Sequence, residues 1–288
     1  MSLLSIPRGH VVNVYLKPGE VKHLTLTSDL HTEDPMCDLQ GLSKMFEARQ
    51  KLAHHSAISI GDLTTLIGHN DTARFRPPVA NPLWATKEAW VDEAIAYTVE
   101  HMTKHGTKWD MVSPGNHEDE WLKRHNTDVT TRIADRLGCP RGGYSGFVDY
   151  RLIMSNTGGP SGKKDKHTRV RVLYHHGAWG GKANKGYTGA RDFANQRDDW
   201  QIFAYGHNHH CRLDPETRIK MKNGKENEYP VYLVNCSSWQ KSYTEDARVT
   251  TYAERRGFPR AIRKAPLVRM WFEIDKNRVI QPHYTVEV

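Results

Sequence analysis

The sequence predicts a layered α/β fold in which two sheets pack together and helices lie outside them. Helix-like and strand-like segments alternate in roughly the first half of the chain, and strand-like segments dominate the second half. An alternating order favours a sheet covered by helices, and the later strands supply a second sheet. The chain has 288 residues, of which 38% are hydrophobic, so it can bury a sizeable core. We expect one compact domain spanning residues 1–288.

In the first half, three predicted strands alternate with three predicted helices. The spacing of Leu42, Met45 and Phe46 is typical of a helix, and a second helical pattern that includes Trp90 ends at Gly106. The expected order is strand 21–28, helix 39–54, strand 56–60, an irregular loop 63–86, helix 87–105, strand 109–113 and helix 118–137.

The second half is expected to consist mainly of strands. Short apolar or alternating runs separated by glycine, proline and asparagine predict them. Residues 237–266 form a long polar stretch, dotted with aromatic side chains, that has no clear periodicity. The expected order is strands 145–155 and 168–175, helix 190–197, and strands 201–205, 212–221, 229–235, 267–274 and 278–288.

Composition and charge limit the class of protein. The four cysteines lie far apart with no CxxC pair, so neither a disulfide framework nor a zinc ribbon is expected. No run approaches eighteen apolar residues, and residues 1–9 lack the features of a signal peptide, so we expect a cytoplasmic protein with no membrane partner. A net charge of +8 attracts polyanions such as nucleic acid, although a basic surface without such a partner is the alternative.

Five short segments each place metal-type ligands directly after a predicted strand. Because the carboxyl ends of strands in an α/β sheet meet at one edge, side chains far apart in the sequence can gather there. Taken singly, an Asp-x-His or a Gly-Asp is more often a capped turn, but the ordered set favours one site. The segments are Asp29-Leu30-His31, Gly61-Asp62, Gly115-Asn116-His117-Glu118, His175-His176-Gly177 and Gly206-His207-Asn208-His209.

The residue types in these segments indicate the kind of metal. Imidazole and carboxylate suit Zn, Fe, Mn or Ni, whereas a structural zinc or an iron–sulfur site would require thiolates. A carboxylate can bridge two cations about 3.5–4 Å apart, which is the spacing used in phosphoryl displacement.

This ordered set resembles the motifs of the calcineurin-like metallophosphoesterase superfamily. The resemblance runs from Asp29 to His209 and implies a four-layer αββα sandwich of two mixed sheets flanked by helices. It also implies two divalent metal ions (Mn, Zn, Fe or Ni), with Asp62 bridging them. The first ion would be held by Asp29, His31, Asp62 and His209. The second would be held by Asp62, Asn116, His176 and His207.

The resemblance further implies catalytic roles for the segment Asn116-His117-Glu118. A hydroxide bridging the ions would attack phosphorus, His117 would donate a proton to the leaving oxygen, and Glu118 would orient and charge that imidazole. Either His175 or His176 fits the fourth motif. His176 is favoured because the family's ligand commonly precedes a glycine, and Gly177 follows it.

Two departures narrow the family. Thr65 stands where purple acid phosphatases have a tyrosine ligand, and Pro114 stands where protein serine/threonine phosphatases have an arginine. A phosphodiesterase is the expected activity. The alternatives are a nuclease acting on DNA or RNA, a nucleic-acid-binding module with structural metals, and a scaffold without chemistry. Residues 236–259 are similar to bacteriophage and prophage-borne members.

Overall fold

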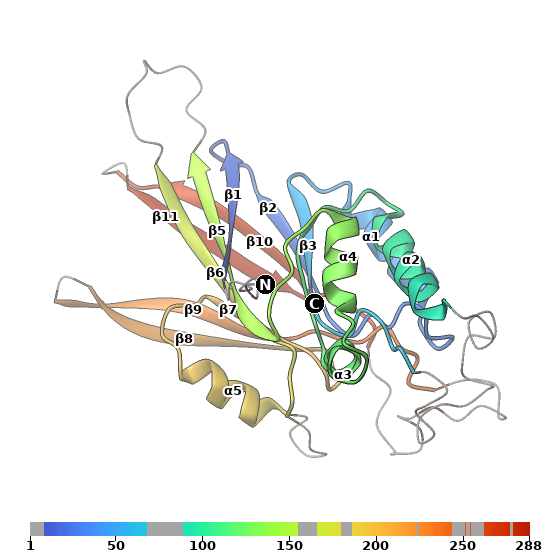
Figure 1. The fold of residues 1–288 in the computed structure, drawn as a ribbon. Coiled ribbons are helices and arrows are strands. Elements are labelled where there is room, and N and C mark those ends of the chain that lie inside the picture. Colours follow the sequence, from blue (N-terminus) through green and yellow to red (C-terminus); the bar gives the residue numbers. More distant parts are fainter. Residues whose placement is uncertain are drawn as a thin grey trace, which may run out of the picture.

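In the computed structural model of the protein, the described residues are 9–67, 89–154, 166–179, 186–222, 224–243, 251, 254, 262–276 and 279–288. They form two mixed sheets packed face to face, with helices on the outer faces (Figure 1). The predicted sandwich fold is therefore confirmed.

The first sheet has five strands in the order β11-β10-β2-β3-β4. Strands β2, β3 and β4 are parallel, while β10 pairs antiparallel with both β2 and β11. The end of the chain thus completes a sheet that the first half begins. The bounds are β2 Lys22–Thr27, β3 His55–Ile60, β4 Trp109–Ser113, β10 Leu267–Ile274 and β11 Ile280–Glu287.

The second sheet has six strands in the order β1-β5-β6-β7-β9-β8. Strands β6, β7 and β9 are parallel neighbours, and β8 and β9 form a long antiparallel hairpin. The bounds are β1 Gly9–Leu16, β5 Ser145–Met154, β6 His167–His175, β7 Ile202–Tyr205, β8 Arg212–Lys222 and β9 Lys225–Asn235.

The main core lies between the two sheets. Leu24, Ile58 and Met270 of the first sheet and Val148 and Val172 of the second are fully buried in one cluster. At about 25 cal/mol per Å² of apolar surface removed from water, this face-to-face packing is the largest stabilising contribution in such a fold.

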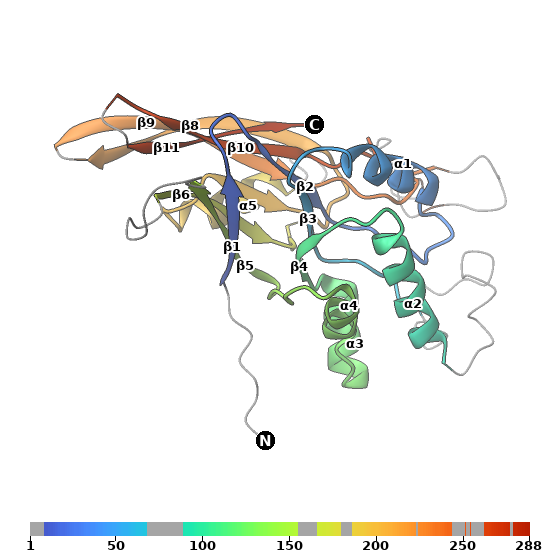
Figure 2. The same ribbon diagram turned by 90° about the horizontal axis from the view of Figure 1, so that it is seen from above.

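Helices cover the outer face of each sheet. The first sheet is covered by α1, α2 and α4, whose side chains Phe46, Ile95 and Ile133 share a second cluster (Figure 2). The second sheet is covered by α5, through Ala190 and Ala194. No helix of the described chain is long and apolar enough to cross a membrane. The bounds are α1 Leu39–Arg49, α2 Trp90–Thr103, α4 Val129–Leu137 and α5 Tyr187–Asn195.

One predicted helix, 118–137, is in fact two. Helix α3 covers Asn116–His125 and ends at Asn126, which adopts the left-handed conformation with φ 50°. Asp128 then caps α4, since its side chain accepts a hydrogen bond from Thr131 N at 2.9 Å. Asn and Asp favour such turns because their short side chains hydrogen-bond nearby backbone.

Strand β1 was not predicted. It is an edge strand that pairs only through β5 among the described strands, and only Val14 and Leu16 of its eight residues carry buried apolar side chains. Its exposed Val11 and Tyr15 hide the alternation that marks a half-buried strand.

Candidate metal centre

The structure brings all seven predicted ligands together where the two sheets meet. Each lies just after the carboxyl end of a strand: six lie on the turns that follow β2, β3, β6 and β7, and Asn116 begins helix α3 after β4. Among the described residues, three groups of potential ligand atoms each lie within 4.8 Å of one another. These groups are Asp29/His31/His209, His31/Asp62/His117 and Asp62/His176/His207.

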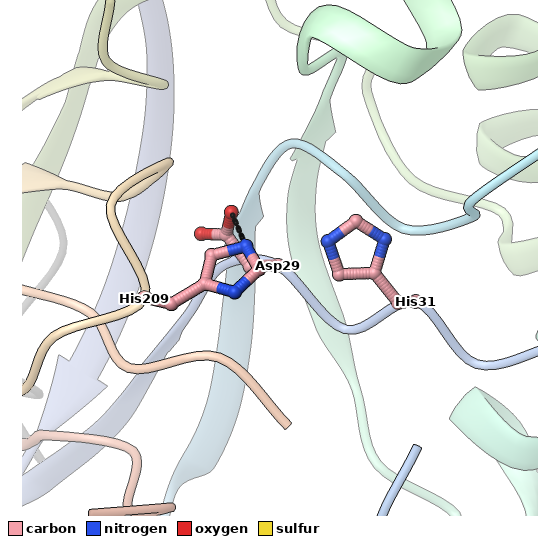
Figure 3. Close-up of side chains that lie close together, drawn as sticks. All are labelled: Asp29, His31 and His209. Atoms are coloured by element: carbon pink, nitrogen blue, oxygen red, sulfur yellow. Dashed lines mark ion pairs between the residues drawn. The ribbon is translucent and has the colours of Figure 1, made fainter. Parts of the chain in front are cut away.

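The first group joins the turn after β2 to the turn after β7 (Figure 3). Asp29 Oδ1 lies 3.3 Å from His209 Nε2, and the rings of His31 and His209 lie 5.4 Å apart. Asp29 Oδ2 accepts a hydrogen bond from His207 N at 2.9 Å. The carboxylate of Asp29 thus holds the histidine turn of the second sheet against the first sheet.

In the group Asp62/His176/His207, both histidines contact the amide oxygen of Asn116. Asn116 Oδ1 lies 3.0 Å from His176 Nε2 and 2.7 Å from His207 Nδ1. Asp62 Oδ2 lies 3.2 Å from His176 Nε2 and 3.9 Å from His31 Nε2. Asp62 therefore contacts ligand candidates from both groups, which is the arrangement expected of a bridging carboxylate.

The structure separates the two neighbouring histidines. His176 is fully buried, and its Nδ1 contacts the Ile60 carbonyl at 2.7 Å while Nε2 faces Asp62. His175 points away: its Nδ1 accepts a hydrogen bond from Gly177 N, and its ring packs against Trp179. Successive side chains of a strand point to opposite faces, so only one of the pair can enter the site.

The backbone at the site is strained. Among the described residues, eight that are not glycine have positive φ, and five of them are predicted ligands. A non-glycine residue in this region costs about 1–3 kcal/mol, and such residues cluster where function requires the geometry. The five are Asp29 (φ 52°), His31 (φ 48°), Asp62 (φ 50°), His207 (φ 73°) and His209 (φ 57°).

Two glycines allow the turns to approach one another. A Cβ at Gly115 would overlap the carboxylate and backbone of Asp62. A Cβ at Gly206 would overlap the side chains of Ser28 and Asp29. Glycine is required at both positions because the backbone passes directly against a ligand candidate.

The donor set is consistent with a divalent cation. His31 Nε2 is buried and lacks a hydrogen-bond partner among the described residues, which is costly unless something else contacts it. His31 Nδ1 contacts Thr65 Oγ1 at 3.0 Å, which leaves Nε2 facing the cluster. This second contact is the usual way in which a ligating imidazole is oriented.

Charge leads to the same conclusion. Burial lowers the pKa of His31 to about 3, so its ring is neutral and can act as a ligand. Burial alone would raise the pKa of Asp29, but the hydrogen bond and charge of His209 lower it to about 2. Burial would lower the pKa of His176, yet Asp62 and Asp29 raise it to about 10. Buried ionised carboxylates need a positive charge beside them, which protonated histidine or a bound cation can supply.

His117 lies at the edge of the cluster. Its backbone N donates to Asp62 Oδ1 at 3.0 Å, and its ring Nδ1 donates to the Thr65 carbonyl at 2.5 Å. The other ring nitrogen therefore faces the group that includes His31 and Asp62. The rings of His117 and His31 lie 5.1 Å apart in an edge-on arrangement.

Glu118 contacts other groups than the imidazole expected from the sequence. Its buried carboxylate accepts hydrogen bonds from Asp62 N, Thr64 N and Gly115 N at 2.9–3.1 Å and from Thr64 Oγ1 at 2.9 Å. The orienting contact to the His117 ring comes from Thr65 instead. Glu118 is the third residue of α3 and its side chain points back to the start of the helix, so it supports the turn that carries Asp62.

Sequence reasoning missed Glu33. Its carboxylate is buried and accepts hydrogen bonds from Thr65 N at 2.5 Å and Leu66 N at 2.7 Å. The available signal was an acidic pair, Glu33-Asp34, directly after the Asp-x-His motif, but the sequence does not identify its partners.

Comparisons with known proteins add little to this geometry. The chain matches no family model and no curated protein. Solved structures that resemble it include Vps29 of Chaetomium thermophilum (9% identity, TM-score 0.35, 92% of this chain and 95% of that chain covered). The NAD nucleotidase NadN of Haemophilus influenzae has 9% identity and a TM-score of 0.40, with 91% of this chain and 49% of that chain covered. GAP50 of Plasmodium has 10% identity, a TM-score of 0.38, and coverages of 92% and 88%. At these scores the function is inferred from the site itself.

Proposed function

We propose that the protein is a metal-dependent hydrolase of phosphate esters, most specifically a phosphodiesterase, that holds two divalent cations. The supporting observation is a pair of adjacent ligand groups that share the buried carboxylate of Asp62. Asp29, His31, Asp62 and His209 would hold the first ion, and Asp62, Asn116, His176 and His207 the second. When bound, the cations would activate water and neutralise charge on the phosphate oxygens.

The remaining chemistry is assigned to residues of the chain. His117 Nε2 would donate a proton to the leaving oxygen, because Nδ1 is engaged by the Thr65 carbonyl and fixes the direction of the ring. Glu118 would act indirectly, since its hydrogen bonds hold the turn on which Asp62 lies.

The net charge of +8 suits an anionic substrate, and DNA or RNA is the alternative diester. A bacteriophage or prophage-borne origin belongs to the same proposal; it was suggested by residues 236–259, most of which lie outside the described residues.

The proposal is tested by stripping the protein with a chelator and reloading it with Mn, Zn, Ni or Fe. Bis-p-nitrophenyl phosphate, p-nitrophenyl phosphate, cyclic nucleotides, DNA and RNA are then assayed, with bound metal counted in parallel. We expect two ions per chain and turnover that returns with the metal, highest on a diester. A fully loaded protein without turnover on any ester, or one that binds no metal, would contradict the proposal.

A matched control comes from the two neighbouring histidines. His176→Ala should lose bound metal and turnover, whereas His175→Ala should retain both, because His175 lies outside the cluster. Equal loss from the two variants would refute the ligand assignment.

A further inference from the structure

The turn after β3 is held by two buried carboxylates, one on each half. Glu118 accepts hydrogen bonds from the amides of Asp62 and Thr64, as described above. Glu33 accepts hydrogen bonds from the next two amides, those of Thr65 and Leu66. Leu66 has φ 47°, so this half of the turn is itself strained.

Thr65 contacts two histidines of the site through two different atoms. Its carbonyl accepts a hydrogen bond from His117 Nδ1, and its hydroxyl contacts His31 Nδ1. The position of the Thr65 peptide therefore determines where the second nitrogen of each ring points. Whatever holds that peptide also holds the geometry of His117.

We propose that Glu33 is a positioning residue for His117, acting by clamping the Thr65–Leu66 peptides. The inference rests on the proposed function, because it takes His117 to be the proton donor of the reaction. Glu33 is 6% exposed, and its Oε2 has no hydrogen-bond partner among the described residues. Burying a carboxyl group with one unsatisfied oxygen costs free energy, so stability alone is a poor reason for its presence.

Glu33 is far in sequence from the amides that it holds, so no neighbouring residue of the turn makes the same contact. Glu33 lies two residues after His31, on the turn after β2, and its partners are 32 and 33 residues away. Without the carboxylate, two amides of a strained turn would lose their acceptor. The Thr65 carbonyl would then be free to rotate, and the His117 ring would lose its fixed direction.

The test compares Glu33→Ala and Glu33→Gln with Glu47→Ala, which removes an exposed glutamate of α1. Gln keeps an oxygen that can accept from both amides, so Glu33→Gln should behave like the parent protein. Activity is measured on metal-loaded protein with a p-nitrophenyl ester and with an alkyl ester, whose leaving oxygen needs a proton. Glu33→Ala should lower kcat on the alkyl ester by about 10–100-fold and on the p-nitrophenyl ester by less than about 3-fold.

A double variant tests whether Glu33 acts through His117. If Glu33 acts through His117, then Glu33→Ala in a His117→Ala background should cause no further loss on the alkyl ester. Additive losses would overturn the inference. If Glu33→Ala does not fold, Glu33→Asp replaces it, because shortening the side chain loosens the clamp while a carboxyl group is kept.

A second readout does not depend on turnover. Nitrogen-15 spectra of the His117 ring in metal-free protein should show a hydrogen-bonded Nδ1–H in the parent and in Glu33→Gln, and its loss in Glu33→Ala. A parent protein without phosphoesterase activity would refute the proposed function, and the spectra would then decide the role of Glu33 alone. An unchanged His117 signal in Glu33→Ala would overturn the inference.

Discussion

At the two ends of the parallel strands β2, β3 and β4 lie two clusters of buried polar side chains that are satisfied in different ways. At the amino ends, Lys22 donates to Ser56, Ser56 donates to Asp110, and Tyr150 of the other sheet donates to Asp110 at 3.1 Å. At the carboxyl ends lie the metal-type ligands. The side chains of the amino-end cluster satisfy one another's hydrogen bonds and so stabilise the fold. The carboxyl-end cluster contains unpartnered atoms and strained backbone, which cost free energy.

The amino-end cluster is complete in itself. Lys22 Nζ lies 3.7 Å from Asp110, and no atom of these four side chains is among the buried unpartnered atoms of the described chain. The carboxyl-end cluster leaves His31 Nε2 and Glu33 Oε2 without hydrogen-bond partners in the part of the chain that the structure describes, and its backbone is strained. Unsatisfied atoms and strained backbone within the ligand cluster itself indicate a site that expects another component.

The largest expected effect tests the carboxyl end. Asp62→Asn should reduce turnover by about 10³-fold or more, because the shared carboxylate is lost from both ligand groups. The unfolding free energy of the metal-free protein should change by only about 1 kcal/mol, since the variant also relieves repulsion with Asp29. Metal content, turnover and denaturant unfolding measure the three quantities. A large loss of stability with the metal retained would contradict the view that the carboxyl-end cluster serves metal binding and the amino-end cluster serves stability.

The amino end should respond in the opposite way. Lys22→Met leaves Asp110 buried without its nearest cation and should lower the unfolding free energy by about 3–5 kcal/mol, with turnover per folded molecule unchanged. Lys108→Met is the matched control. Lys108 also lies near Asp110, at 4.0 Å, but its side chain is 73% exposed, so its loss should cost less than about 1 kcal/mol. Similar losses from the two variants would mean that burial is not the deciding factor.

A smaller effect is expected at Thr65. Thr65→Val removes the hydroxyl that contacts His31 Nδ1 and retains the carbonyl that orients His117. Metal affinity, measured by calorimetry, should fall by about 10–100-fold, whereas the leaving-group dependence at saturating metal should not change. Thr65→Ser should restore the affinity, and a failure to do so would assign the loss to packing.

The smallest effect is a pH dependence at the amino end. Burial lowers the pKa of Lys22 to about 8 despite the attraction of Asp110. Between pH 8 and the unfolded value near 10.5, the folded chain binds fewer protons than the unfolded chain, so stability rises with pH in this window. Between pH 8 and 10.5 the unfolding free energy of the parent should rise by about 1–3 kcal/mol relative to that of Lys22→Met. Below pH 8 the difference between the two proteins should not vary with pH.

The other groups that face Lys22 are Asp110, Tyr150, Lys108 and His55. These groups are present in both the parent and Lys22→Met, so the difference between their unfolding free energies reports on Lys22 alone. A difference that does not vary between pH 8 and 10.5 would contradict the assignment.

Residues that follow strands were predictable because their placement depends on local sequence. Asp29, Asp62 and His207 each follow a short apolar run, and strand ends meet at one edge. The roles of Glu33 and Thr65 were not predictable, because their contacts join turns more than 30 residues apart.

The elements that the sequence analysis predicted wrongly, or did not predict, also depend on features that local patterns do not reveal. The break at Asn126 depends on a left-handed turn that helical periodicity does not reveal. Strand β1 buries too few side chains to show a strand pattern. The Lys22 cluster was missed because a lysine at the start of a strand is ordinarily solvated, and because its partners Ser56, Asp110 and Tyr150 lie on other strands far along the chain.

The hydrogen bond from His207 N to Asp29 Oδ2 joins residues 178 positions apart. Closing so long a loop costs entropy, so we expect this contact to form only after the two sheets have associated. We therefore expect the ligand geometry to be acquired late as the chain folds. A cation that recognises this geometry would bind the finished protein and slow its unfolding, without accelerating the earlier steps of its assembly.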